Sequence, residues 1–234
     1  MPLAAREHGP AAIEPFLWGL SPDNVQELER WGKTFQVSPR SVFALIAHVG
    51  GDCAGAVQVV QRERVGACAH GQGNVEWLDD AGMEARLKAL REDHAAWRPP
   101  RDTGQFSLAD AQPKTALLFE DGRWGVPSGR TPTTHSLKPP TGLFDGHVES
   151  EPICLSPARS LGLPTASSRV MRFGEEVAIV VERYDRIRAG NQLLVAEVNL
   201  ISTLANGAPK GSNCRSSRRS DSRRTSHPGR PAPL

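Results

Sequence analysis

The sequence predicts an α+β fold with a helical N-terminal part, an antiparallel β lobe and a disordered C-terminal tail. Up to residue 49, apolar side chains recur at intervals of three and four residues, as on one face of a helix. From residue 104 onward, short apolar segments alternate with turns, as in β-hairpins. After residue 204, Ser, Arg and Pro predominate without apolar periodicity, so the tail cannot bury enough surface to offset its ordering entropy.

The first segment is expected to contain three helices and a strand. Apolar residues from Ile13 to Leu20 have helical spacing, and Ser21-Pro22-Asp23 has the composition of a second helix start. Ser38-Pro39 repeats that signal, and Gly50-Gly51 is expected to end the third helix. The apolar residues between Ala54 and Val60 predict a strand.

A further strand and helix are expected before the pattern breaks. Residues 76–78 favour a short strand, and Asp79-Asp80 favours the start of a helix with Met83, Leu87 and Leu90 on its apolar face.

The segment Arg98-Pro99-Pro100-Arg101 is the best candidate for a boundary between two modules. We therefore expect one domain over residues 1–98, a second over residues 104–190 and a disordered tail over residues 191–234.

The second module is expected to be built from hairpins around one helix. Five strands and a helix are predicted in chain order, with a turn at residues 120–123. They cover residues 115–119, 124–127 and 133–138, the helix at 149–161, and then residues 170–173 and 176–182.

Charge and cysteine content exclude several classes of function. The net charge is +2, but residues 205–234 carry seven basic residues and one acid, which leaves 21 basic and 25 acidic residues before them. The body, with a net charge of −4, therefore gives no electrostatic sign of direct nucleic-acid binding. The four scattered cysteines form no metal-binding pattern and are typical of a reduced cytoplasmic protein. No apolar run is long enough for a membrane span, and the N-terminus does not resemble a signal peptide.

Three local patterns carry candidate chemistry, each with an ordinary alternative. Residues 104–115 form a loop of small residues that enters a strand, which suits phosphate binding but equally an ordinary loop. Lys138 ends an apolar strand, where it suits either a phosphate contact or solvent exposure. Residues 180–186 follow a strand into a charged segment, which suits either an adenine-binding hinge or a strand end with a salt bridge.

In this order the patterns resemble the HipA family of bacterial serine/threonine kinases, the toxin half of HipA–HipB toxin–antitoxin modules. Residues 16–24, FLWGLSPDN, are similar to the family's F-x-x-G-L-L-P-E/D-N segment. Residues 43–56, FALIAHVGGDCAGA, are similar to its F-x-L-L-x-x-x-G-x-D/E-C-A-G-A-x segment. The resemblance spans about residues 1–190 and implies a HipA N-terminal subdomain followed by a kinase-like antiparallel small lobe.

The resemblance also implies site residues, with ATP and Mg²⁺ as cofactors. Ser107 matches an autophosphorylated loop serine, Lys138 matches the lysine on the ATP phosphates, and Glu151 matches the helix glutamate that pairs with this lysine. The remaining implied ATP-binding positions are those of the phosphate loop and the hinge. They are Leu108, Ala109, Asp110, Ala111, Gln112, Pro113 and Lys114 in the loop, and Glu182, Arg183 and Tyr184 in the hinge.

Two departures from the family pattern predict weak nucleotide binding. Asp110 replaces the loop glycine, so a carboxylate would face the phosphates and backbone freedom would be lost. Pro157 falls inside the predicted helix, where proline costs about 3 kcal/mol or more, whereas Pro152 suits a first turn. The prolines therefore argue against the Lys138–Glu151 ion pair.

The resemblance also leads us to expect a truncated, catalytically inactive chain. A kinase requires a catalytic Asp, a neighbouring Asn and a second Asp on Mg²⁺. Nothing after Arg188 resembles the family's H-x-x-N or D-G-H-x-x-N segments, and the tail reads like an out-of-frame sequence. We therefore predict no catalytic residues in this chain.

Two other functions remain open at this stage. Residues 1–98 could bind a HipB-like antitoxin, in which case DNA would be contacted only indirectly. The basic segment Arg215 to Arg224 could instead bind nucleic acid non-specifically. The protein substrate is unknown, and no membrane partner is expected.

Overall fold

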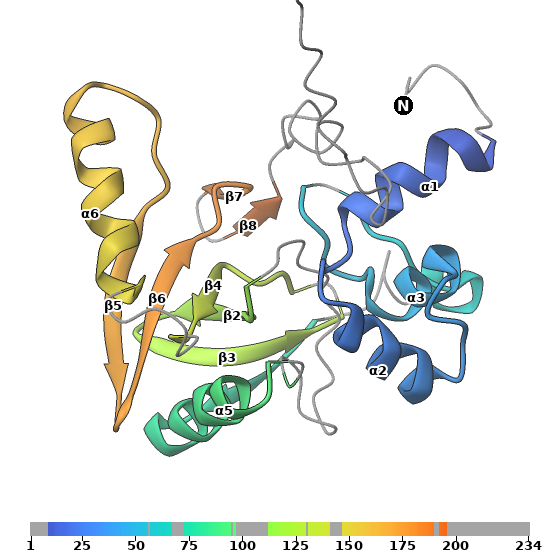
Figure 1. The fold of residues 1–234 in the computed structure, drawn as a ribbon, viewed down its shortest axis with the longest axis horizontal. Coiled ribbons are helices and arrows are strands. Elements are labelled where there is room, and N and C mark those ends of the chain that lie inside the picture. The colour runs from blue at the N-terminus through green and yellow to red at the C-terminus, as the bar shows by residue number, and fades with distance from the viewer. Residues whose placement is uncertain are drawn as a thin grey trace, which may run out of the picture.

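The computed structural model describes residues 9–55, 57–66, 73–94, 96, 112–129, 131–140, 147–189 and 192–195. It contains helices and an antiparallel sheet of six strands, which confirms the predicted α+β class (Figure 1). Within these residues no helix has the length and apolarity needed to cross a membrane. The predicted loop residues Ser107 to Ala111 lie outside the described residues.

The N-terminal helices form one compact unit. They are α1 (Pro10–Gly19), α2 (Val25–Phe35) and α3 (Val42–Val49), followed by a single 3-10 turn, η1 (Arg62–Arg64). Their apolar faces meet in a core that contains Leu17, Trp31, Leu45 and Ile46, all almost completely buried. The three helices expected from apolar spacing are thus confirmed.

The starts of two of these helices were predicted incorrectly. The side chain of Asn24, not Ser21 or Asp23, caps α2 by accepting hydrogen bonds from the backbone N–H groups of Gln26 and Glu27. Ser41, rather than the earlier Ser38-Pro39, caps α3 through the N–H of Ala44. Asn and Ser side chains satisfy otherwise unpaired first-turn donors, so the correct signal lay a few residues further along the chain.

The strand predicted between Ala54 and Val60 is also wrong. The described residues of this segment run without a strand partner, and the N–H of Val59 instead donates to the carbonyl of Gly50. The segment folds back on the turn that follows α3, because its residues pack against the helical core rather than along a sheet.

The sheet has the strand order β1-β3-β2-β4-β6-β5, with every neighbouring pair antiparallel. The turn between β2 and β3 has Asp121 and Gly122 at positive φ, as a two-residue hairpin turn requires. The strands are β1 (Asn74–Leu78), β2 (Thr115–Glu120), β3 (Arg123–Ser128), β4 (His135–Lys138), β5 (Ser168–Phe173) and β6 (Glu176–Glu182).

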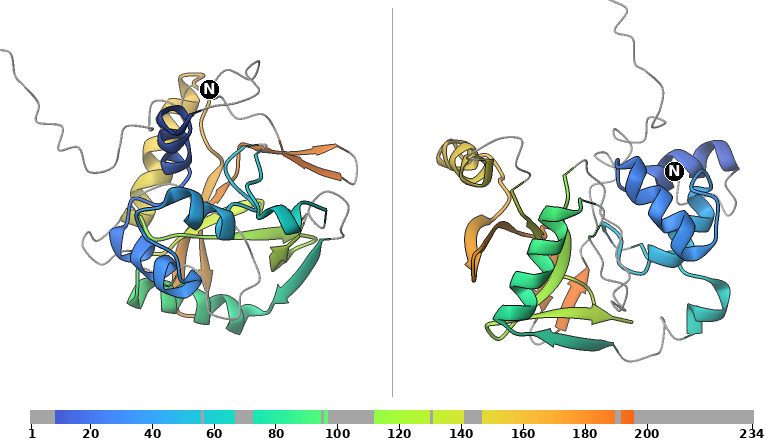
Figure 2. Two further views of the ribbon diagram at one scale, coloured as in Figure 1. Left: turned by 90° about the vertical axis from the view of Figure 1, so that its right-hand side faces the viewer. Right: turned by 60° about the horizontal axis from the view of Figure 1, so that its bottom comes forward.

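Helix α5 (Asp80–Glu92) covers one face of this sheet (Figure 2). The side chain of Asp79 caps it, and Met83 and Leu87 pack against Leu117 and Leu137 of the sheet. Because β1 pairs with β3 and α5 packs on the sheet, elements on both sides of the predicted boundary at residues 98–104 share one sheet and core. The domain limits themselves stay a prediction.

Helix α6 (His147–Ser160) packs against β5 and β6, on the far side of the molecule from the N-terminal helices (Figure 1). It continues through Pro152 and Pro157, as the helix predicted over residues 149–161 requires, so the cost expected at Pro157 does not interrupt it. Pro157 lies on the exposed face of the helix near its end, where water can hydrogen-bond the Ile153 carbonyl that loses its N–H partner.

A small hairpin follows the sheet. It consists of β7 (Arg186–Ala189) and β8 (Gln192–Val195), paired antiparallel. β8 lies in the segment from residue 191 onward where no ordered element was expected, and the apolar run Leu193 to Val195 gives it strand character. Residues 196–234 lie outside the described part of the chain.

Candidate nucleotide site and the hinge network

Lys138 and Glu151 form an ion pair between the sheet and α6. Lys138 ends β4, and its Nζ lies 3.2 Å from Oε2 of Glu151, with both side chains largely shielded from solvent. The prolines of α6 therefore do not prevent this pairing, contrary to our expectation. An ammonium group held at the end of a strand by a helix carboxylate can present positive charge to a phosphate while keeping a fixed position.

The end of the predicted phosphate loop lies beside this ion pair. Gln112, Pro113 and Lys114 lead directly into β2, whose first residue pairs with Leu137 of the neighbouring β4. Lys114 and Lys138 thus lie at the same end of adjacent antiparallel strands. Two lysines and the described end of the predicted loop therefore lie at one end of these two inner strands.

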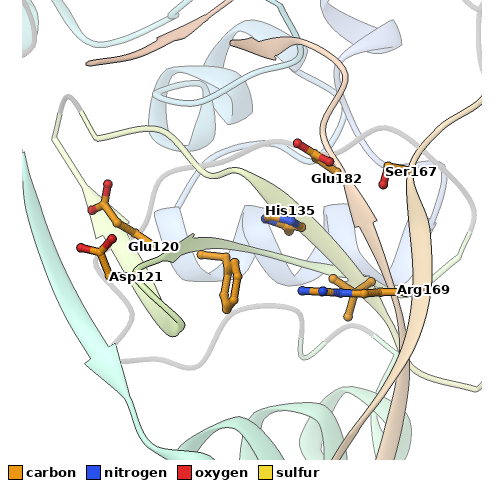
Figure 3. Close-up of a pocket in the computed structure, with 8 residues that line it drawn as sticks. Glu120, Asp121, His135, Ser167, Arg169 and Glu182 are labelled. Carbon is orange, nitrogen blue, oxygen red and sulfur yellow. The ribbon is translucent and has the colours of Figure 1, made fainter. Parts of the chain in front are cut away.

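A cavity of about 430 Å³ lies on the other face of the sheet, toward the other ends of β4 and β6 (Figure 3). Successive side chains of a strand point to opposite faces, so His135 and Leu137 face α5 whereas Lys138 faces α6. The residues that line the cavity are Phe119, Glu120, Asp121, His135, Ser167, Arg169, Val180 and Glu182.

The chemistry of this cavity does not suit phosphates. It has three carboxylates against the single guanidinium of Arg169, which lies over the ring of Phe119. Burial lowers the pKa of His135, and Arg169 acts in the same direction against the opposing effect of Glu182. The imidazole is therefore neutral near pH 7, and the net charge of the lining is negative. Of the predicted ATP-binding residues that the structure describes, Glu182 alone lines this cavity.

The three predicted hinge residues differ in how far their side chains are exposed to solvent. Glu182 ends β6, Arg183 is buried at 8% exposure, and Tyr184 is 71% exposed. The side chain of Arg183 points into the protein rather than toward a ligand. It enters a cluster of four charged residues and one threonine, which we call the hinge network and define as Asp52, Thr133, Arg183, Asp185 and Arg186.

Arg183 bonds to three separate segments of the chain. Its Nε and Nη2 donate to the two carboxylate oxygens of Asp185 at 3.1 and 2.8 Å, and its Nη1 donates to Oγ1 of Thr133 at 2.9 Å. Nη2 also donates to the carbonyl of Cys53 at 3.1 Å. The guanidinium therefore joins the hinge to the residues just before β4 and to the turn after α3.

Arg186 completes the network from the other side. It donates to Oδ1 of Asp52, to Oδ2 of Asp185 at 2.7 Å and to the carbonyl of Thr133 at 2.9 Å. Oδ2 of Asp52 accepts from both the N–H and the Oγ1 of Thr133, at 2.8 and 2.7 Å. The N–H of Gly55 donates to Asp185 at 2.8 Å, so the carboxylates are bonded from both halves of the fold.

The two guanidinium and two carboxylate groups balance in charge while almost excluded from water. Burial alone would raise the pKa of Asp185, but the hydrogen bonds and charge of Arg183, with support from Gly55 and Arg186, hold it below its ordinary value. Burial and the neighbouring Asp52 raise the pKa of the Cys53 thiol to about 12, so Cys53 is a neutral structural residue here.

Sequence reasoning found only part of this network. Arg183 was assigned to the hinge because it follows an apolar strand, and a salt bridge at the strand end was the stated alternative. Asp52 lay within the motif residues 43–56, yet its partner Arg186 is 134 positions away. Local spacing carries no signal for a contact at that separation.

Comparisons with known proteins give evidence on the family of this chain that is independent of the site geometry. Residues 1–60 match the family model described as HipA N-terminal domain, and residues 106–209 match the HipA-like C-terminal domain. A protein of Sinorhizobium fredii named putative kinase Y4mE is 34% identical over 194 residues, which is 80% of this chain and 44% of that protein. The serine/threonine-protein kinase toxin HipA of Shewanella oneidensis is 28% identical over 187 residues, which is 74% of this chain and 38% of that protein.

A solved structure is similar in three dimensions. It is a chain of the Shewanella oneidensis complex of HipA, HipB and operator DNA, with a TM-score of 0.59 and 27% identity. The match covers 79% of this chain and 41% of that chain. The chain thus spans about two fifths of the length of the relatives that it matches.

Asp185→Asn tests the energetic importance of the hinge network. Loss of one carboxylate leaves an uncompensated buried charge, so the free energy of unfolding at pH 7 should fall by about 3–5 kcal/mol. The folded-state pKa of Asp185 lies below its ordinary value of 3.8, so its contribution is present above that value and is lost as the pH falls through the lower one. Urea unfolding at several pH values should show the difference between wild type and variant shrinking below about pH 4.

The matched control is Asp93→Asn, which removes a carboxylate from an ion pair with Arg30 in which both side chains are about half exposed. It should change stability by less than about 1 kcal/mol. Equal effects of the two substitutions would contradict the importance of burial.

Proposed function

We propose, since this chain belongs to the HipA family, that it is the nucleotide-binding part of a HipA-like serine/threonine kinase toxin and does not itself transfer phosphate. The observation that carries the proposal is the Lys138–Glu151 ion pair beside the end of the predicted phosphate loop. A cytoplasmic location belongs to the same proposal.

The phosphate end of the site would be formed by Lys138, Glu151 and the loop that enters β2. In protein kinases a strand lysine contacts the nucleotide phosphates and a helix glutamate holds that lysine in place. The 3.2 Å separation of Nζ and Oε2 matches these roles, because the carboxylate fixes the ammonium without burying it completely. The residues present therefore fit the phosphates of ATP.

The adenine end would be formed by the backbone of residues 182–184, where β6 ends. A planar base would pair there with main-chain groups other than the N–H groups of Glu182 and Arg183, which bond within the protein. The buried side chain of Arg183 would hold the segment from behind. Asp110 in place of the family glycine would weaken binding by repelling phosphate charge. Mg²⁺ would neutralise charge on the phosphates of bound ATP.

Phosphoryl transfer requires groups that the proposal does not assign to this chain. An Asp must accept the substrate hydroxyl proton, and further Asp and Asn side chains must hold the metal. No H-x-x-N segment follows Arg188 in the sequence. We therefore assign binding, and not catalysis, to these 234 residues.

Lys138→Met should reduce ATP affinity at least tenfold, because the variant lacks the ammonium that faces the phosphates, a loss of about 1.4 kcal/mol or more. Isothermal titration of the purified chain with Mg·ATP measures the effect. Lys33→Met, which removes an exposed lysine from α2, should leave affinity unchanged. ATP binding that is identical in wild type and Lys138→Met would refute the assignment of Lys138.

No phosphate should be incorporated when the chain is incubated with radiolabelled Mg·ATP and a general protein substrate. The physical reason is that aligned phosphates still require a base and metal ligands. Mass spectrometry of Ser107 and scintillation counting of the substrate give the measurement, with an intact HipA-family kinase as the positive control. Label on Ser107 or on the substrate would show that the chain is an active kinase.

A second candidate function is binding of a HipB-like antitoxin. It is favoured by the match of residues 1–60 to the HipA N-terminal domain and by the solved neighbour, whose complex includes HipB and operator DNA. In that case the chain would contact DNA only through its partner.

Co-expression with a HipB-like protein encoded beside this chain should yield a complex on size-exclusion chromatography. A HipB-like protein from an unrelated module is the matched control and should elute separately. Separate elution of the cognate pair at micromolar concentration would remove this second function but leave the nucleotide proposal intact.

A further inference from the structure

The turn after α3 holds the hinge from behind. Asp52 lies in this turn, and it accepts hydrogen bonds from Arg186 and from both the backbone and the side chain of Thr133. The same turn supplies the Cys53 carbonyl to Arg183 and the Gly55 N–H to Asp185. The hinge is thus bonded to a segment about 130 residues earlier in the chain.

These bonds fix the backbone on both sides of Tyr184. Before it, the N–H of Arg183 donates to the carbonyl of Thr134 at 2.9 Å, and the N–H of Glu182 donates to Ser167 at 2.9 Å. After it, the N–H of Arg186 returns to the carbonyl of Arg183 at 3.2 Å. The path of residues 182–184 is therefore held by these backbone bonds and also by the side chains of Arg183 and Arg186, which are anchored in the turn after α3.

The charge balance of the network requires Asp52 as well as Asp185. Without its carboxylate, two guanidinium groups would share one buried Asp, and the cluster would carry an unmatched positive charge. Either water would have to enter and solvate that charge, or one arginine would have to leave the network. Both changes would shift the backbone of residues 182–184. Asp185 bonds to Arg183 within a local turn, whereas Asp52 is the carboxylate that the N-terminal unit contributes, beside the Cys53 carbonyl and the Gly55 N–H.

We infer that Asp52 is a positioning residue for the adenine end of the nucleotide site, acting through Arg183 and Arg186 on the backbone of residues 182–184. This inference rests on the proposed function. It gives the N-terminal unit a role in ATP recognition without any contact between that unit and the nucleotide.

The geometry separates this role from phosphate binding. The hinge network meets β4 at its first residues, next to Thr133 and Thr134, whereas Lys138 ends the same strand. The two ends are about 10 Å apart along a strand with a rise of about 3.3 Å per residue. A disturbance at Asp52 should therefore weaken adenine recognition and spare phosphate recognition.

The test compares Asp52→Asn with wild type for two probes, Mg·ATP and Mg·tripolyphosphate, by isothermal titration of the full chain. ATP affinity should fall about tenfold, which corresponds to about 1.4 kcal/mol, while tripolyphosphate affinity should change by less than about twofold. Hydrogen exchange of the peptide around Tyr184 should accelerate in the variant. Unchanged ATP affinity, or an equal loss for both probes, overturns the inference.

Asp93→Asn is the matched control, since it makes the same acid-to-amide change in an exposed ion pair, and it should alter neither affinity. Circular dichroism and thermal melting establish that each variant is folded. If Asp52→Asn does not fold, Thr133→Val replaces it, because that change keeps the side-chain shape while it removes a donor to Asp52 and an acceptor for Arg183. A folded Thr133→Val that loses ATP affinity selectively supports the inference, and one that binds both probes like wild type overturns it.

The outcome for wild type separates the two proposals. Wild-type chain that binds neither probe refutes the proposed function and the inference with it. Wild-type chain that binds ATP while Asp52→Asn binds ATP equally well refutes the inference alone.

Discussion

A buried guanidinium is tolerated only where its charge is matched and its donors are bonded, and this constraint organises the fold. Arg183 and Arg186 lie together with less than a tenth of either side chain exposed, so two carboxylates must enter the same small volume. One of them, Asp185, comes from the same turn, and the other, Asp52, comes from the N-terminal unit. The relative placement of the helical unit and the sheet is therefore fixed by electrostatics as well as by apolar packing.

The alternation of side chains along the strands divides the sheet into two chemically different faces. The face toward α5 carries the apolar core and, at one end, an acid-lined cavity. The face toward α6 carries Lys138, whose charge is matched by Glu151. A phosphate would be repelled on the first face and attracted on the second, so this acid-lined cavity is distinct from the proposed phosphate site.

The sequence carries much of the local structure, because periodicity and turn chemistry depend on neighbouring residues. The helix face of Met83, Leu87 and Leu90, the hairpin at Asp121 and Gly122, and the order of strands around α6 were all predicted from such patterns. Predictions failed where tertiary contacts compete with local preference. The apolar residues after Ala54 pack on the helical core instead of joining a sheet, and Pro157 is accommodated on an exposed helix face.

For the site, sequence could identify the residue types but not their partners. The family resemblance named both Lys138 and Glu151, yet the prolines between Glu151 and the helix end made their contact look unfavourable. Proline removes one backbone donor and disturbs one turn, but Glu151 lies six residues before Pro157, nearly two turns away at 3.6 residues per turn. The energetic cost of Pro157 therefore does not affect the geometry of the ion pair. A destabilising residue in one turn of a helix is weak evidence against a contact made from another turn.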